Sequence, residues 1–176
     1  MLIGNTLYAN HIFDLAKTKK DEVFYNSNAE HASIVHQALV KYADNYIDIF
    51  CGCMCTEISN NEIYCKLIEE FLNNDKTHKI NIILTDYSDD FLSKPIAKTL
   101  AKYSSQVVVK KYDGQLIYNE NPVHFTVTSD RAFRLETDIE NHMAFGNFNS
   151  PEQAMALRKV FEKVFSSELV KPITLA

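Results

Sequence analysis

Apolar residues along the chain form short continuous runs that alternate with helix-like spacings. Residues 47–54 and 79–85 are almost continuously apolar, which is typical of strands buried on both faces of a sheet. A third short run covers residues 106–110, and helical spacings separate the three runs. Strands that alternate with helices are joined by right-handed crossovers. We therefore expect three parallel strands in one sheet, centred on Ile49, Ile82 and Val108.

Helix starts are marked by capping signals. Ser27 with Glu30, and Ser59 with Glu62, have the Ser-x-x-Glu spacing of a capping box, in which both side chains bind free amides at a helix start. Ser150 is followed by a proline, an acid and a glutamine, which also favour a helix start. The predicted helices run to about residue 42, through residues 63–72, from Pro95 through residue 101, and from Pro151 to about residue 165.

The pattern changes after Asp113-Gly114. Residues 123–129 and 132–138 form two strand-like runs joined by Asp130 and Arg131, which predicts an antiparallel hairpin. A short strand at residues 143–148 follows, and residues 23–27 also favour a strand. Residues 7–13 fit a short strand or a helical turn, and the tail from Glu168 is weakly determined. The predicted fold class is α/β, three-layered, with a mixed, mostly parallel sheet flanked by helices.

Size and charge exclude several classes of protein. The 176 residues suit a single domain, with 46% hydrophobic and 23% charged residues. The net charge of -5 gives no electrostatic attraction for nucleic-acid polymers. The apolar runs are far shorter than the ~20 residues that a membrane helix needs. The first residues lack the pattern of a secretory leader, so we expect a cytoplasmic protein that does not enter membranes.

The cysteines Cys51, Cys53 and Cys55 are spaced two apart. On a strand such residues share one face, so we expect reduced, largely buried thiols. The alternative is a zinc site with Cys65 as the fourth ligand. Zinc sites normally use paired cysteines on turns, which this spacing does not provide, so we predict no metal.

One segment carries candidate chemistry. His124-Phe-Thr-Val-Thr-Ser-Asp130 is followed downstream by Gly146-Asn147-Phe148-Asn149. On a strand, the side chains of His124 and Thr126 share one face. This order of residues resembles the phospholipase D superfamily, whose motif is H-x-K-x₄-D followed by a strand end with Gly and Asn. The resemblance extends over about residues 24–167 and implies one phospholipase D-like half-domain, with residues 1–176 as a single domain.

The resemblance implies a role for each matching residue. His124 matches the nucleophile that forms a phospho-histidine, Asp130 the acid that orients a histidine, and Asn147 or Asn149 the residue that binds phosphate oxygens. Thr126 stands where the family has lysine, and Asp130 comes one residue early. A cation at that lysine position stabilises charge on the phosphoryl oxygens, and one such donor is worth roughly 3–4 kcal/mol. The arginines that follow, Arg131 and Arg134, are the candidates to replace it.

Simpler interpretations of the same residues stay open. His124 can be a hydrogen-bonded structural residue, and Asp130 with Arg131 can be a polar turn. Arg134 and Glu136 lie two apart on one strand face, so they can form a charge pair without any ligand.

Three hypotheses for function follow. The first is a phospholipase D-like domain that has lost catalysis and binds, senses or assembles, beside a larger bacterial partner or as a homodimer. The second is an active phosphodiesterase or nuclease that uses His124 from two chains, because small members of the family pair two half-domains. The third is an unrelated α/β protein-interaction domain. The first two imply a phosphodiester or nucleotide ligand, and none requires a cofactor. For either of them we expect His124 in an open cleft with Asn147 or Asn149 and an arginine, whereas burial of His124 against helix side chains would leave only the third.

Overall fold

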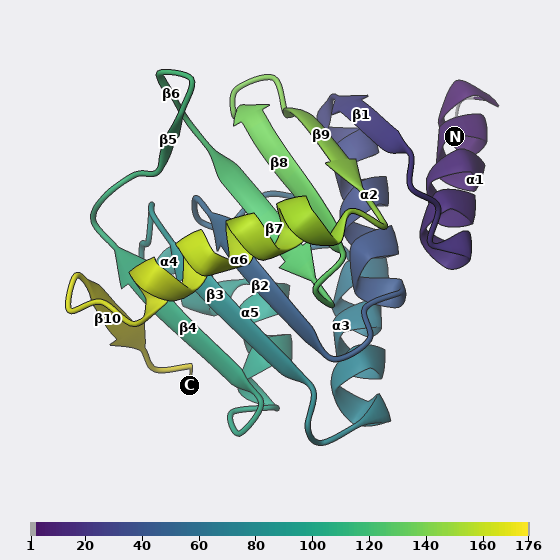
Figure 1. Ribbon diagram of the computed structural model, residues 1–176. Coiled ribbons are helices and arrows are strands. Elements are labelled where there is room, and N and C mark those ends of the chain that lie inside the picture. Colours follow the sequence, from purple (N-terminus) through teal and green to yellow (C-terminus); the bar gives the residue numbers. More distant parts are fainter. Residues whose placement is uncertain (1–2, 176) are drawn as a thin grey trace.

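A computed structural model describes residues 3–175. Eight strands form one twisted sheet that crosses the whole molecule (Figure 1). In spatial order the strands are β1 (Val23–Ser27), β9 (Met143–Asn147), β8 (Ala132–Asp138), β7 (His124–Thr128), β2 (Tyr46–Cys51), β3 (Lys79–Leu84), β4 (Val107–Tyr112) and β10 (Val170–Ile173).

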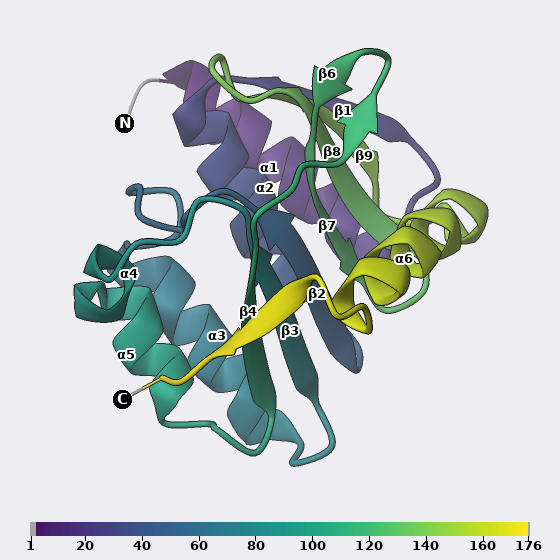
Figure 2. The same ribbon diagram turned by 90° about the vertical axis from the view of Figure 1, so that its left-hand side faces the viewer.

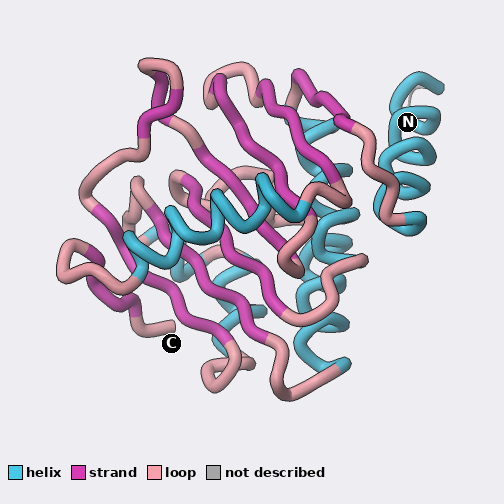
Figure 3. The backbone as a smooth tube through the Cα atoms, viewed as in Figure 1, coloured by secondary structure: helices cyan, strands magenta, loops and turns pink. Residues whose placement is uncertain are grey.

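Helices cover both faces of this sheet, so the protein has three layers (Figure 2). One face carries α1 (Ile3–Thr18), α2 (Ala29–Lys41), α3 (Glu62–Asn74), α4 (Asp90–Ser93) and α5 (Pro95–Ala101); the other carries α6 (Pro151–Phe165). A small hairpin of β5 (Ile117–Tyr118) and β6 (Asn121–Pro122) projects from one end of the sheet (Figure 3). Among residues 3–175, no helix has both the length and the apolar character needed to cross a membrane.

The strand directions confirm the α/β fold class and correct one detail. As predicted, β2, β3 and β4 are parallel neighbours, and β7 and β8 join the same sheet. The other neighbouring pairs among the described strands are antiparallel, so the sheet is mostly antiparallel and not mostly parallel as predicted. The reason is that hairpin strands from the second half of the chain, together with β1 from its start, fill one side of the sheet.

The helix starts lie within two residues of the predicted caps. Asn28, not Ser27, caps α2, and its side-chain oxygen accepts a hydrogen bond from the His31 amide at 2.8 Å. Asn61 caps α3 in the same way, while the Ser59 hydroxyl donates to the Met54 carbonyl at 3.1 Å. Asparagine and serine are both good caps, so the sequence alone could not choose between neighbouring candidates.

The alternation of β7 places its polar residues on one face and its apolar residues on the other. Phe125 and Val127 are buried under α6, and the Phe125 ring stacks on Phe50 with 5.4 Å between ring centres. Thr126 lies opposite Ile49, whose side chain belongs to the core beneath α3. His124 and Thr126 therefore point toward the layer of α2 and α3.

The cysteine prediction is wrong about the end of β2. This strand ends at Cys51, and Cys53 and Cys55 lie in the loop that follows. Met54 between them has a φ of 52°, a left-handed conformation that no strand contains. All four cysteines are free thiols, and they are half-buried, not fully buried. The helix α1 and the strand β10 were not predicted, because their segments gave weak or mixed patterns.

Candidate functional site

A pocket of about 550 Å³ opens where β2 ends and β7 begins. The two strands are antiparallel, with Phe50 opposite Phe125, so the start of β7 lies beside the last residue of β2. Thr85 comes directly after β3, which is parallel to β2, and therefore reaches the same edge. The pocket is lined by Cys51, Gly52, Cys53, Met54, Thr56, Ile58, Ser59, Thr85, Asp86, Gln115, His124, Glu136, Ile139 and His142.

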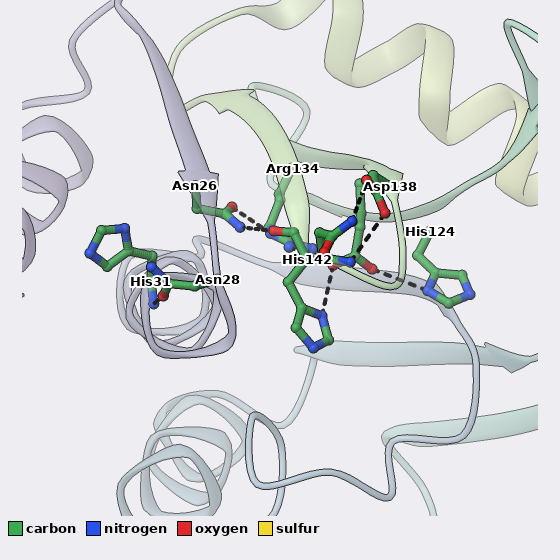
Figure 4. A network of polar contacts seen from close by, with 9 residues as sticks. Asn26, Asn28, His31, His124, Arg134, Asp138 and His142 are labelled. Carbon is green, nitrogen blue, oxygen red and sulfur yellow. Dashed lines mark hydrogen bonds and ion pairs between the residues drawn. The ribbon is translucent and has the colours of Figure 1, made fainter.

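The carboxylate of Glu136 is the centre of a polar network beside this pocket. Figure 4 shows its partners His124, Arg134 and His142. Its Oε2 lies 3.2 Å from Nδ1 of His124. Its Oε1 accepts a hydrogen bond from Nη2 of Arg134 at 2.8 Å and lies 3.4 Å from Nδ1 of His142. The hairpin register fixes this arrangement, because His124 is directly opposite Glu136 and Thr126 is opposite Arg134.

Arg134 is a buried cation that is already bound on two sides. It is 2% exposed, and its Nε donates to Oδ1 of Asn26 at 3.0 Å. The Asn26 amide group in turn donates to the carbonyl of His142. Asn26 reaches the network because β1 lies next to β9, where it pairs with Ala144. Asn26 therefore forms hydrogen bonds both to Arg134 in the β7–β8 hairpin and to the turn that carries His142.

The charges of the network set the protonation of Glu136. Burial raises the pKa of this carboxyl, but the hydrogen bond from His124 and the nearby charge of Arg134 outweigh burial and hold its pKa at about 2. The carboxylate is ionised at neutral pH and can only accept hydrogen bonds, so His124 donates from Nδ1. Nε2 of His124 is then the nitrogen left for a ligand. This nitrogen lies close to Gly52: a Cβ atom at position 52 would be 3.8 Å from Nε2.

His36 of α2 approaches the network from the helical layer but supplies no charge. Burial, together with the positive charge of Arg134, lowers its pKa to about 3. The imidazole is therefore neutral at physiological pH. Its ring meets Tyr64 edge-on, with 6.3 Å between ring centres.

The candidates Asp130 and Arg131 lie at the far end of the hairpin from His124. His124 begins β7 and Asp130 lies in the turn beyond its end, so the length of the strand, roughly 13 Å, separates them. Asp130 accepts hydrogen bonds from the Tyr46 hydroxyl at 2.7 Å and from Arg158 at 2.6 Å. Arg131 donates to the carbonyls of Phe148 and Tyr42. These contacts close the turn between β7 and β8.

Asn147 and Asn149 are at the same far end. The Asn147 amide group donates to Asp21 at 2.8 Å, and its side-chain oxygen accepts from the Asn149 backbone at 2.7 Å. Thr126 is on the same strand face as His124 but is 3% exposed and does not line the pocket. Of the residues singled out in the sequence, the structure brings together His124, Arg134 and Glu136, and it places Asp130, Arg131, Asn147 and Asn149 elsewhere.

The sequence interpretation missed His142 and Asn26. Asn26 reaches the network through the long-range pairing of β1 with β9, and His142 reaches it from the turn between β8 and β9, so neither has a spacing that marks it. Two imidazoles and one carboxylate meet here, yet residues 3–175 contain no group of three His, Cys, Asp or Glu side chains arranged to hold a metal ion. Arg134 already occupies one side of the carboxylate.

The sequence matches no protein-family profile and no curated protein. Several solved structures share its fold. Nuc of Salmonella typhimurium, a phospholipase D family member, is 8% identical with a TM-score of 0.60, and the match covers 88% of this chain and 99% of Nuc. NucT of Helicobacter pylori is 12% identical with a TM-score of 0.58 over the same shares. The archaeal chromatin protein TrmBL2 is 10% identical with a TM-score of 0.61, over 97% of this chain and 63% of TrmBL2.

These likenesses, all at low identity, concern the fold. The chain has the fold of the phospholipase D superfamily. Nuc and NucT are each matched over 99% of their length, so the likeness extends over almost the whole of both structures.

Proposed function

We propose that this chain is a phospholipase D-like module that binds a phosphodiester or nucleotide ligand and does not hydrolyse it. The observation that carries the proposal is the pocket wall around His124. It contains no lysine and no arginine among the described residues. The nearest cation, Arg134, is already bound to Glu136 and Asn26.

The missing cation affects turnover more than binding. Charge builds on the phosphoryl oxygens as the phosphodiester reacts, and a fixed cation stabilises that charge by roughly 3–4 kcal/mol per donor. Thr126, at the lysine position of the motif, is neutral and buried. A ligand in its ground state needs less charge stabilisation and can be held by hydrogen bonds alone.

The assembly is part of the same proposal. We propose that residues 1–176 act as one domain and pair as a homodimer or with a larger protein partner, as the resemblance implies. TrmBL2 is described as binding DNA. The net charge of -5 opposes long nucleic acids, which favours a small ligand here.

A second candidate is an active phosphodiesterase. The observation that favours it is the hydrogen bond between His124 and the ionised Glu136, which fixes the imidazole with Nε2 free beside a pocket. The shared fold argues against the third hypothesis, an unrelated interaction domain.

Hydrolysis of bis-p-nitrophenyl phosphate tests the two candidates. We expect no turnover by the wild type, by His124→Ala or by His11→Ala, a control at a half-exposed histidine that pairs with Glu22. A robust wild-type rate that His124→Ala abolishes and His11→Ala preserves would replace the first candidate with the second. Light scattering tests the assembly, and a monomer at all concentrations would contradict the homodimer.

A further inference from the structure

His142 shares the carboxylate of Glu136 with His124. It lies on the turn between β8 and β9, and its Nδ1 faces Oε1 while Nδ1 of His124 faces Oε2. Both imidazoles also line the same pocket. The resemblance assigns the second histidine of the site to a second chain, but this chain already holds two.

The backbone of His142 is fixed in place. It has a left-handed φ of 54°, and its carbonyl accepts a hydrogen bond from the buried Asn26. The Asn26 side chain is in turn held by Arg134. The ring is therefore presented by the same buried network that orients His124, although it belongs to a surface turn.

The charges around the pocket favour a role for both histidines in anion binding. Glu136 is balanced by Arg134, and Asp86 in the pocket wall adds one negative charge. One protonated imidazole only cancels Asp86, so the pocket stays neutral. A second protonated imidazole makes the pocket positive, and no other cationic side chain lines it among the described residues.

We propose that His142 is the second phosphate-binding histidine of the pocket, so that His124 and His142 of one chain together bind the phosphoryl group of one ligand. This inference rests on the proposed function and gives it a stoichiometry of one ligand per chain. Each Nε2, which points away from Glu136, donates a charge-assisted hydrogen bond to a phosphoryl oxygen.

Several charged or titratable groups surround the two rings. These are Glu136 and Arg134 from β8, Asp86 after β3, the thiols Cys51 and Cys53 of the β2 end and loop, and His36 of α2. Glu136 stays ionised and His36 stays neutral near neutral pH, and burial keeps Cys51 a neutral thiol because it raises the pKa. None of these three groups therefore adds a positive charge to the pocket.

Titration of inorganic phosphate into ¹⁵N-labelled protein near pH 6 tests the inference through the histidine side-chain resonances. We expect shifts at Nε2 of both His124 and His142 with one phosphate per chain. His142→Ala should weaken phosphate binding by about tenfold or more, as expected for a lost charge-assisted bond. His142→Gln should recover part of the affinity, and His11→Ala should leave it unchanged.

Three results would overturn the inference. They are unchanged affinity in a folded His142→Ala protein, one phosphate per two chains, and no response of the wild-type histidines to phosphate. A different result would refute the proposed absence of hydrolysis. Turnover of bis-p-nitrophenyl phosphate with both histidines responding would refute the non-catalytic function and leave the role of His142 standing.

Discussion

Glu136 is the residue on which the site depends, because it neutralises a cation that has no access to bulk water. Arg134 is 2% exposed and Glu136 is 6% exposed, and their hydrogen bond is 2.8 Å long. Removing one partner of such a pair leaves an uncompensated buried charge, which costs far more than the pair contributes as a unit. The network is thus a structural requirement as well as a binding device.

We predict that Glu136→Gln destabilises the protein by about 3 kcal/mol at pH 7, because Arg134 loses its counter-charge. Glu140→Gln, at an exposed position in the same turn region, is the matched control and should change stability little. Urea unfolding of both variants and the wild type gives the comparison. Equal stability of Glu136→Gln and the wild type would show that Arg134 needs no carboxylate.

The same substitution changes the acid response. The pKa of Glu136 is about 2 in the folded protein, below its ordinary value near 4.5. Its contribution to stability is therefore complete above pH 4.5 and is lost as the pH falls toward 2. In Glu136→Gln this loss is absent, so the stability difference between variant and wild type should narrow across that acid range.

At the scale of elements, the helix starts show how local signals compete. Ser27 and Asn28 are adjacent, and both are residue types that cap helices. The backbone of Asn28 is extended, and its side chain reaches the His31 amide, so it takes the position of the cap. A sequence pattern predicts the start of α2 to within one residue but cannot decide which of these two residues is the cap.

We predict that Asn28→Ala lowers the free energy of unfolding by about 1 kcal/mol, the usual cost of losing a cap. Ser27→Ala, one residue earlier, should cost much less, because Ser27 ends β1 and does not cap the helix. Thermal or urea unfolding of the two variants distinguishes them. A larger loss of stability for Ser27→Ala than for Asn28→Ala would show that Ser27 caps the helix, as the sequence predicted.

The limits of sequence interpretation follow from the same elements. Continuous apolar runs predicted β2, β3 and β4, and the tight connector at Asp130 predicted the β7–β8 hairpin. The mostly antiparallel sheet was missed because β1, β10 and the strands of the second half of the chain all join it in antiparallel pairs, and most of these pairings are long-range. For the site, His124 was found from its motif. Asn26 and His142 were not, since the long-range pairing of β1 with β9 brings Asn26 there and the shape of the β8–β9 turn places His142.

At the scale of the whole molecule, the α6 side of the sheet carries its own buried acid. Asp48 of β2 is 2% exposed and accepts a hydrogen bond from Asn81 at 2.9 Å. Arg158 of α6 approaches its carboxylate only to 3.7 Å. Burial raises the pKa of Asp48 to about 6, because the hydrogen bond and the arginine offset only part of the lost hydration.

This shift makes the stability of the protein depend on pH. A carboxyl whose pKa is raised by folding contributes stability that is complete below its unfolded pKa near 3.8, and that contribution is lost as the pH rises through 6. We predict that Asp48→Asn is more stable than the wild type at pH 8 by up to about 3 kcal/mol, and that the advantage shrinks toward pH 5. Unfolding curves at both pH values give the test, and a variant less stable at pH 8 would contradict it.

The position of β1 also affects the order in which the parts of the protein can fold. Asn26 and Arg134 are 108 residues apart in the chain, yet their hydrogen bond completes the network. On the ribosome, β1 emerges before β9, the strand with which it pairs in the sheet. Contacts so distant in sequence form slowly, because the intervening chain must first be closed into a loop. We therefore expect the pocket to be the last part of the molecule to mature, after the parallel strands have already formed their core.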